Sequence, residues 1–404
     1  MLTSVAMTML RMIFVAAILS TLEFSGYAAI VSAGAFVSIL LSFGVIEGTI
    51  KQFPRMGAIK QYDIILKESL SLVKVLSARS FYLLVVFIIS IFVLFKVPGD
   101  YIAIILIGYI GAITSLFASL QRALFNPLHL AFSSFLRTLV MFVFVVISGL
   151  LYGYYGALIA EVVVGLMAMF IPWIIANYTI KNKARTEECL LVGNNYSSII
   201  SEHGIVLFFT YLILSIPIYL DRMYVNTFYD SDSSATYSVI AIFLSISIVL
   251  PNIISQKLGP VLIKMQTQLT SSEVITHKAL RWSVLTISIW ILIITTIGLG
   301  FQSGYLPASL EKYRISIDML FAIGVLGCMN IAAFFEFIVI SYNYEKQFLY
   351  IALGYILLII FIASFAIILS MPIYTLIIMI AFVKFIYLST LISVSYYPNV
   401  FKLN

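Results

Sequence analysis

Charge is scarce in this sequence, and its scarcity excludes an ordinary soluble fold. Of the 404 residues, only 10% are Asp, Glu, Lys or Arg, whereas soluble globular domains contain about 25%. Hydrophobic residues make up 62% of the chain, and its mean hydropathy is +1.12. Most of the chain therefore has lipid as its solvent.

Several kinds of catalytic and binding motif are also missing. The two cysteines, Cys189 and Cys328, fall in a predicted loop and a predicted span, so neither a disulfide framework nor redox chemistry is indicated. The three histidines lie in separate connections without metal-ligand spacing, and we expect no metal site. No Walker A sequence is present, so ATP hydrolysis is not expected either. We predict no resident cofactor.

Long apolar runs are what the sequence has instead. A transmembrane barrel would show short alternating strands of about 10 residues, whereas a helical span needs roughly 20 apolar residues. We predict an all-α, polytopic integral membrane protein with about 12 transmembrane helices in two six-helix lobes. The predicted spans are 4–22, 28–49, 79–95, 101–120, 131–149, 154–176, 204–220, 236–255, 282–301, 316–341, 348–369 and 373–395.

The basic residues predict the orientation. With the amino terminus inside, 17 of the 23 Lys and Arg residues fall on the cytosolic side and four on the outer side, which agrees with the positive-inside rule. We therefore predict that both termini are cytoplasmic. Because this charge lies in short loops beside the spans, the net charge of +6 does not indicate nucleic-acid binding.

A polar connection near the middle of the chain separates six predicted helices from six. We predict an N-terminal lobe at 1–180, a cytosolic connector at 181–203 and a C-terminal lobe at 204–404. Sliding the second half back by 210 positions brings Tyr237 onto Tyr27 with similar apolar spacing. This pattern indicates two lobes in parallel orientation.

Three basic residues lie inside predicted spans. Arg11 and Lys384 lie midway along theirs, and Arg137 lies six residues inside its span, or about 10 Å at helical rise. A charged side chain at a helix centre costs about 2.5 to 3.5 kcal/mol on insertion scales, so it usually faces a cavity or a partner. Each of the three could bind an anionic substrate, or could form a structural ion pair or an interfacial anchor.

Acidic residues inside or at the ends of spans are candidate ion-coupling groups. They are Glu161 in span six, Glu336 in span ten and Asp221 at the end of span seven. A carboxylate in a low dielectric can shuttle a proton, but it can equally neutralise a buried cation.

Three segments carry a resemblance to a known family. FSGYAAIVSAGAFVSILLSFGVIEGTIKQFPRM at 24–56 looks like a glycine-tyrosine start and a glycine-then-basic end of helix two. IYLDRMYV at 218–225 and LPNIISQKLGPVLIKM at 250–265 are similar to an aspartate-containing end of helix seven and a proline-containing helix eight. In these segments the chain resembles the O-antigen (Wzx-type) flippases of the multidrug, oligosaccharidyl-lipid and polysaccharide exporter superfamily.

This resemblance implies a V-shaped, two-lobed transporter of a bacterial inner membrane. Its cationic central cavity would receive the pyrophosphate and sugars of an undecaprenyl-linked oligosaccharide while the lipid tail stays in the bilayer. The family's basic groups on helices one, two and eight match Arg11, Lys51 and Lys257 in this sequence. Lys51 and Lys257 lie at cytosolic helix ends, so positive-inside topology accounts for them equally well.

The leading interpretation is a flippase that moves undecaprenyl-pyrophosphate-linked oligosaccharide units to the periplasmic leaflet by alternating access. Its predicted partners are the lipid bilayer, the lipid-linked substrate, and a polysaccharide polymerase with its chain-length machinery. H⁺ and Na⁺ are the candidate coupling ions. The predicted substrate-binding residues are Arg11, Lys51, Lys257, Lys384 and Arg137.

Two alternatives stay open. A cation-coupled multidrug exporter of the same superfamily is favoured if Glu161 or Glu336 proves essential while Arg11 does not. A membrane glycosyltransferase or polysaccharide polymerase would need catalytic groups on outer loops, and the largest predicted outer loop, 221–235, is short. In a deletion strain, single lipid-linked repeat units accumulating inside would indicate a flippase, and units accumulating outside would indicate a polymerase.

Overall fold

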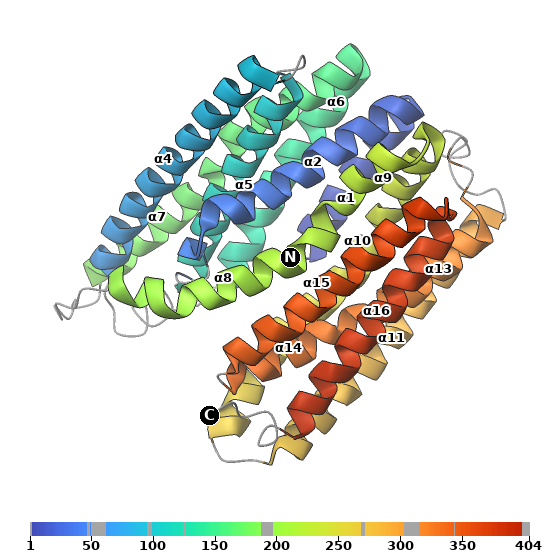
Figure 1. Cartoon of the computed structure of the whole chain (residues 1–404). Helices are drawn as coiled ribbons and strands as arrows, with labels where there is room; N and C mark the ends of the chain where they lie inside the picture. The colour runs from blue at the N-terminus through green and yellow to red at the C-terminus, as the bar shows by residue number, and fades with distance from the viewer. Residues whose placement is uncertain are drawn as a thin grey trace. The chain divides into compact units, whose positions relative to one another are not determined.

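The computed structural model describes residues 2–46, 49, 62–94, 99–123, 127–186, 197–267, 271–302, 313, 315–342 and 344–397. The regular structure of these residues is helical throughout, without a strand. The helices, in chain order, are α1 (Leu2–Ile18), α2 (Thr21–Ser42), α4 (Tyr62–Leu94), α5 (Gly99–Ala123), α6 (Pro127–Ala168), α7 (Phe170–Thr186), α8 (Ser197–Tyr219), α9 (Asp221–Phe228), α10 (Ser231–Thr267), α11 (Ser272–Gln302), α13 (Ile317–Cys328), the 3₁₀ turn η1 (Met329–Ile331), α14 (Ala332–Ser341), α15 (Glu345–Ile368) and α16 (Ile373–Tyr396) (Figure 1).

Every predicted span overlaps one of these helices. Nine helices of the described residues are long and apolar enough to cross a membrane, and a pair that bends by 41° between Tyr219 and Asp221 could be a tenth. One of the nine, residues 129–182, contains two of the predicted spans. The apolar part of α1, Ala6–Ile18, is too short to be counted with them. A helical, polytopic membrane fold is therefore confirmed.

The chain reverses direction inside α6, at Gly153. This glycine has φ 63° and ψ −144°, a conformation that costs glycine little because it has no Cβ. A Cβ built on Gly149 would lie 3.6 Å from the Cβ of Ala157, and one on Gly165 would lie 3.8 Å from Cε of Met141. Eight residues of straight helix would separate the first two by about 12 Å, so the two arms of α6 lie side by side as a hairpin.

By internal packing the chain separates into two compact units, Met1–Tyr224 and Val225–Asn404. Helix α8, which the sequence places in the second lobe, groups with the first unit and packs against α2. The Phe43 ring at the end of α2 lies 4.9 Å from the Phe208 ring of α8, centroid to centroid. The boundaries of the two predicted lobes stay a prediction.

Close packing of α2 against α5 organises the first unit (Figure 1). A Cβ on Gly34 of α2 would lie 2.5 Å from Cγ2 of Ile107, and one on Gly108 of α5 would lie 2.6 Å from Cγ1 of Val37. Glycine at these positions lets the two backbones approach more closely than any side chain would allow. Helix α1 packs on α6 in the same unit.

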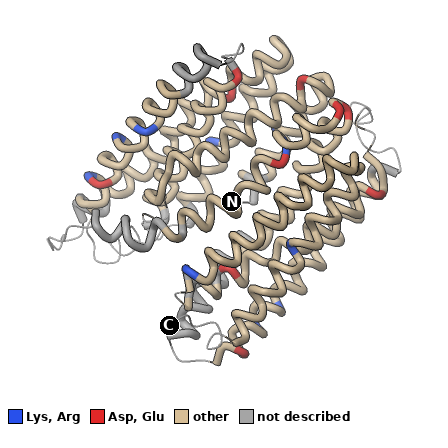
Figure 2. The backbone as a smooth tube through the Cα atoms, in the orientation of Figure 1, with Lys and Arg blue, Asp and Glu red and all other residues tan. Residues whose placement is uncertain are grey.

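In the second unit, α16 packs against α13, α14 and α15, and α11 packs against α13. The last contact rests on the fully buried Trp290, whose Nε1–H donates to the carbonyl oxygen of Gly324 at 2.9 Å. Lys, Arg, Asp and Glu are sparse along the helices of both units (Figure 2). The few that are buried in the described residues therefore need an explanation.

Replacing Gly108 by valine will destabilise the first unit, because its Cβ would also lie 3.1 Å from the carbonyl oxygen of Gly34 and the helices would have to separate. We expect a loss of about 1–3 kcal/mol, as for other overpacked cores, seen as a lower midpoint of thermal unfolding in detergent. Gly354→Ala is the matched control, since no atom lies within 4 Å of its Cβ position. Equal midpoints for Gly108→Val and the wild type would contradict the close packing.

Candidate functional site

A buried ion pair joins α1 to the second arm of α6. Nη1 of Arg11 donates to Oε2 of Glu161 at 2.9 Å, and the two side chains are 12% and 4% exposed. The hydroxyl of the fully buried Tyr27, on α2, donates to Oε1 of the same carboxylate at 2.8 Å. Three helices therefore converge on one carboxylate, and we call Arg11, Tyr27 and Glu161 the Glu161 cluster.

Local features of each helix place these side chains. Helix α2 starts at a capping box, in which the Ser20 hydroxyl accepts from the backbone N–H of Glu23 and the Glu23 carboxylate accepts from the backbone N–H of Ser20. Such a box fixes where a helix begins, and Tyr27 follows about two turns later. Glu161 lies on the returning arm of α6, so the reversal at Gly153 brings it back to α1 and α2.

The guanidinium of Arg11 is only partly satisfied by this pair. An arginine has five N–H donors and can hold a carboxylate with two parallel hydrogen bonds. Here one donor, Nη1, contacts Glu161, while Nε is buried without a partner among the described residues. A buried charged donor that makes no hydrogen bond costs free energy. A further hydrogen-bond acceptor at Nε of Arg11 would therefore stabilise this site.

Arg137 supplies a second guanidinium near the same carboxylate. Gly149 lies opposite Ala157 and Gly165 opposite Met141 across the α6 hairpin, and the same pairing puts Val145 opposite Glu161. Arg137 is eight residues before Val145 on the first arm, a distance of about 12 Å along the helix. It makes no ion pair or hydrogen bond with the described residues, yet the charges of both Arg11 and Glu161 act on it. Two cations thus share one acid in this part of the first unit.

The second unit contains a different arrangement around Lys384. Nζ of Lys384, on α16, donates to Oδ1 of Asn330 in the 3₁₀ turn η1. Nδ2 of Asn330 in turn donates to the Ser247 hydroxyl of α10 at 2.6 Å, and that hydroxyl donates to the carbonyl oxygen of Leu244 at 2.7 Å. We call Lys384, Asn330 and Ser247 the Lys384 cluster.

Glu336 lies close to this cluster without pairing directly with its lysine. The Tyr387 hydroxyl donates to Oε1 of Glu336 at 2.9 Å, and the Tyr355 ring lies 4.8 Å from the Tyr387 ring, centroid to centroid. The charges of Glu336 and Lys384 act on each other, but no ion pair joins them within the described residues. Each of the two charges therefore contacts a neutral polar group and not the other charge.

The remaining predicted residues are Asp221, Lys51 and Lys257. Asp221 begins α9 at the bend after α8, and its Oδ1 accepts the backbone N–H of Arg222 at 2.7 Å. Lys51 lies outside the described residues. Lys257 lies in α10, but its side chain also falls outside the described part of the chain.

Sequence reasoning missed the neutral members of both clusters. Tyr27, Asn330 and Tyr387 form hydrogen bonds with the buried charges, and nothing in their spacing distinguishes them from other residues of the spans. Asn330 had one usable signal, because an amide within an apolar span must find hydrogen-bond partners.

Removing Glu161 alone will destabilise the protein more than removing the pair together. Glu161→Leu leaves Arg11 buried without a counter-charge, and breaking a buried pair in this way costs about 3–5 kcal/mol. Arg11→Leu should cost less, because Arg137 still compensates the carboxylate. Thermal unfolding of both single variants and of the double variant Arg11→Leu/Glu161→Leu tests this. Strictly additive losses would show that the two side chains are not coupled.

No protein-family model matches the chain, and no curated protein matches it either. Several solved structures are similar to the chain. An inward-facing multidrug resistance MATE family transporter of the MOP superfamily has a TM-score of 0.59 at 10% identity, covering 97% of this chain and 93% of that one. MATE in complex with MaL6 has a TM-score of 0.61 at 14% identity, covering 97% and 92%.

A mutant of the Vibrio cholerae MATE transporter VcmN has a TM-score of 0.55 at 12% identity, and the likeness covers 100% of this chain and 94% of that one. At identities this low the likeness establishes the fold and nothing finer. The chain has the fold of the MATE transporters, a helical polytopic membrane fold.

Proposed function

We propose that this protein is an ion-coupled secondary transporter in which Glu161 is the coupling group. The observation that supports it is the burial of one carboxylate between Arg11 and Tyr27 in a chain with this fold. The similar structures include a multidrug resistance transporter, so export of organic molecules against H⁺ or Na⁺ is the function that the fold favours. Because these similar structures are transporters, a transport function is favoured over the glycosyltransferase and polymerase alternatives.

The Glu161 cluster has two states that an ion can select. In one state the carboxylate is charged and holds Arg11 through a buried ion pair. In the other, a proton or Na⁺ neutralises the carboxylate, so that Arg11 and Arg137 have no counter-charge and repel each other in a medium of low dielectric. An ion that binds one state better shifts the protein toward it, and this shift would drive the transport step.

A second candidate function is a flippase for lipid-linked oligosaccharides, and the surplus of guanidinium groups favours it. Arginine binds phosphate through a planar fork and is more weakly hydrated than lysine. Arg137 lies about 12 Å from the level of Glu161, toward the predicted cytosolic end of α6. A pyrophosphate approaching from the cytosol would meet Arg137 first and Arg11 second, while its undecaprenyl tail stayed in the bilayer.

If the protein is a flippase, further proposals follow for its location, its partners and its other charged residues. The protein would act in a bacterial inner membrane, with both termini in the cytoplasm. A polysaccharide polymerase and its chain-length machinery would receive the translocated units. Lys51, Lys257 and Lys384 would add cations along the substrate path, and Glu336 and Asp221 would be further ion-coupling groups.

Transport by purified protein in liposomes tests the coupling role of Glu161, with ethidium as the probe and an imposed pH or Na⁺ gradient as the driving force. Glu161→Gln keeps the size of the side chain and its acceptor for Tyr27 but removes the charge. We expect its gradient-driven uptake to fall at least about tenfold, the effect of losing one essential proton carrier. Glu23→Gln is the matched control, because glutamine preserves the capping box. Wild-type uptake by Glu161→Gln would contradict the proposal.

If wild-type protein moves no ethidium, the flippase candidate is tested in cells at matched protein level. Arg11→Gln and Arg137→Gln should each reduce surface polysaccharide and leave single lipid-linked units on the cytoplasmic leaflet. Lys181→Gln, an exposed cation of α7, should leave export unchanged. Undiminished export by both arginine variants would remove these residues from the substrate path.

A further inference from the structure

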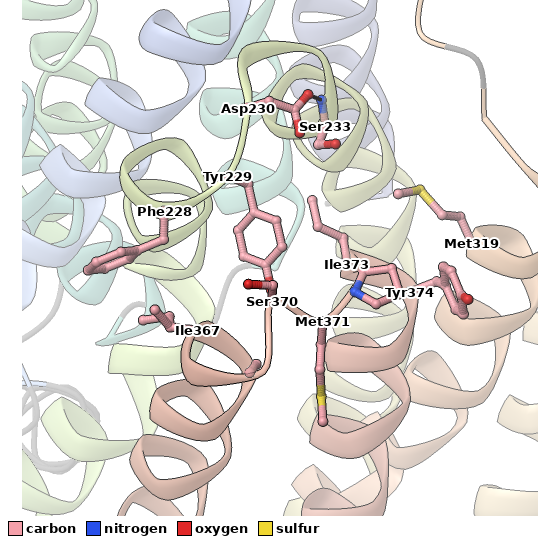
Figure 3. A pocket seen from close by; sticks show the side chains of 12 residues that line it. Phe228, Tyr229, Asp230, Ser233, Met319, Ile367, Ser370, Met371, Ile373 and Tyr374 are labelled. Carbon is pink, nitrogen blue, oxygen red and sulfur yellow. Dashed lines mark hydrogen bonds between the residues drawn. The ribbon is translucent and has the colours of Figure 1, made fainter.

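The second unit contains a cavity of about 430 Å³, between the α9–α10 junction, the first turn of α13 and the turn between α15 and α16 (Figure 3). Asp230 lines it, and no lysine or arginine of the described residues does so. An anionic ligand therefore has no cation to bind there. The cations suited to such a ligand lie instead on α4, in the first unit.

Helix α4 has one buried face and one exposed face. The buried face packs on α5 and α7, and it consists of Ile65, Ser69, Leu72, Leu76 and Ser80. Shifted by two residues, a second row with the same spacing is exposed, and we call it the α4 row: Lys67, Ser71, Lys74, Ala78 and Tyr82. Two residues of a helix turn through about 200°, so the two rows lie on opposite faces. The α4 row is the face that this helix presents to its surroundings.

The start of α4 extends beyond the hydrocarbon of a bilayer. Its 33 residues make a helix about 50 Å long, whereas the hydrocarbon core is about 30 Å thick. The span predicted from the sequence, 79–95, begins after both Lys67 and Lys74. We therefore expect the two lysines at the level of the lipid headgroups, on the cytosolic side by the predicted orientation.

Basic residues follow one another along α4 (Figure 2), but they differ in what they bind. Arg79 is engaged within the protein. Its Nη1 donates to the carbonyl oxygens of the last two residues of α2 at 3.3 and 2.9 Å, and its guanidinium lies 5.4 Å from the centroid of the Phe43 ring. Lys67 and Lys74 form no ion pair with the described residues. Their charges are therefore available to a ligand outside the protein.

We propose that the α4 row binds an anionic phospholipid of the cytoplasmic leaflet. Lys67 and Lys74 lie on one face of the helix, about 10 Å apart along its axis, and each ammonium can bind a phosphate oxygen. Beyond them Ala78 has a small side chain, and Phe81 and Tyr82 are 65% and 69% exposed. An acyl chain can lie over Ala78 against these rings while the phosphate stays with the lysines.

Neither candidate function assigns a role to this face, so the inference goes beyond the proposed function. A lysine at the surface of an anionic leaflet raises affinity for it about fivefold, so two lysines together give a measurable preference for anionic over zwitterionic lipid. Arg79 joins the same helix to the end of α2. A lipid bound to the α4 row therefore braces a helix that is itself attached to α2.

Lipid binding to the full-length protein in detergent, followed by native mass spectrometry, tests this with phosphatidylglycerol and phosphatidylcholine as probes. We expect Lys67→Gln/Lys74→Gln to weaken phosphatidylglycerol binding at least about tenfold and to leave phosphatidylcholine binding unchanged. Each single variant should lose about fivefold. The matched control is Lys181→Gln/Arg281→Gln, which removes two exposed cations of the predicted cytosolic side and should alter affinity less than about twofold.

Equal losses in the two double variants would overturn the inference, because the cytosolic side as a whole would then attract the lipid. Wild-type affinity in Lys67→Gln/Lys74→Gln would overturn it as well, and so would an equal loss for both lipids. The thermal unfolding midpoint of each variant without added lipid should match the wild type, since both lysines are exposed. The measurement involves no transport, so its result is independent of the role of Glu161.

Discussion

A charge inside a lipid-facing helical bundle must find a counter-charge or a polar partner, and this constraint shapes the interior of both units. In the first unit Glu161 satisfies Arg11 directly and is itself held by Tyr27. The pair is far from ideal, since Arg11 uses one donor on the carboxylate and Arg137 remains without an ion-pair partner in the described residues.

The second unit meets the same constraint differently. Lys384 binds the amide of Asn330, and Glu336 binds the hydroxyl of Tyr387, so the two charges influence each other without contact. Asn330 also lies in a 3₁₀ turn between α13 and α14. Breaks of this kind in the middle of a long helix often mark functional hinges. The first unit therefore has a direct ion pair, whereas in the second unit each charge binds a neutral polar group.

The sequence was sufficient to predict the helical membrane fold and the positions of the buried charges. Arg11, Glu161, Glu336 and Lys384 stand out because ionisable residues are rare in apolar windows of this length. Pairing was not predictable, since Arg11 and Glu161 lie 150 residues apart and meet only because α6 reverses at Gly153. Neither composition nor periodicity reveals which helix faces which. The neutral partners were missed for the same reason, because a tyrosine in a span is most often a packing residue.

The central claim is that Glu161 changes between a charged, Arg11-bound state and a neutralised one. Infrared difference spectroscopy of the purified protein in lipid, recorded between high and low pH and with and without Na⁺, observes this change directly. The account predicts a carboxylate signal that shifts with pH or Na⁺ in the wild type and disappears in Glu161→Gln. A carboxylate of Glu161 that keeps one unchanged spectrum under every condition that supports transport would contradict it.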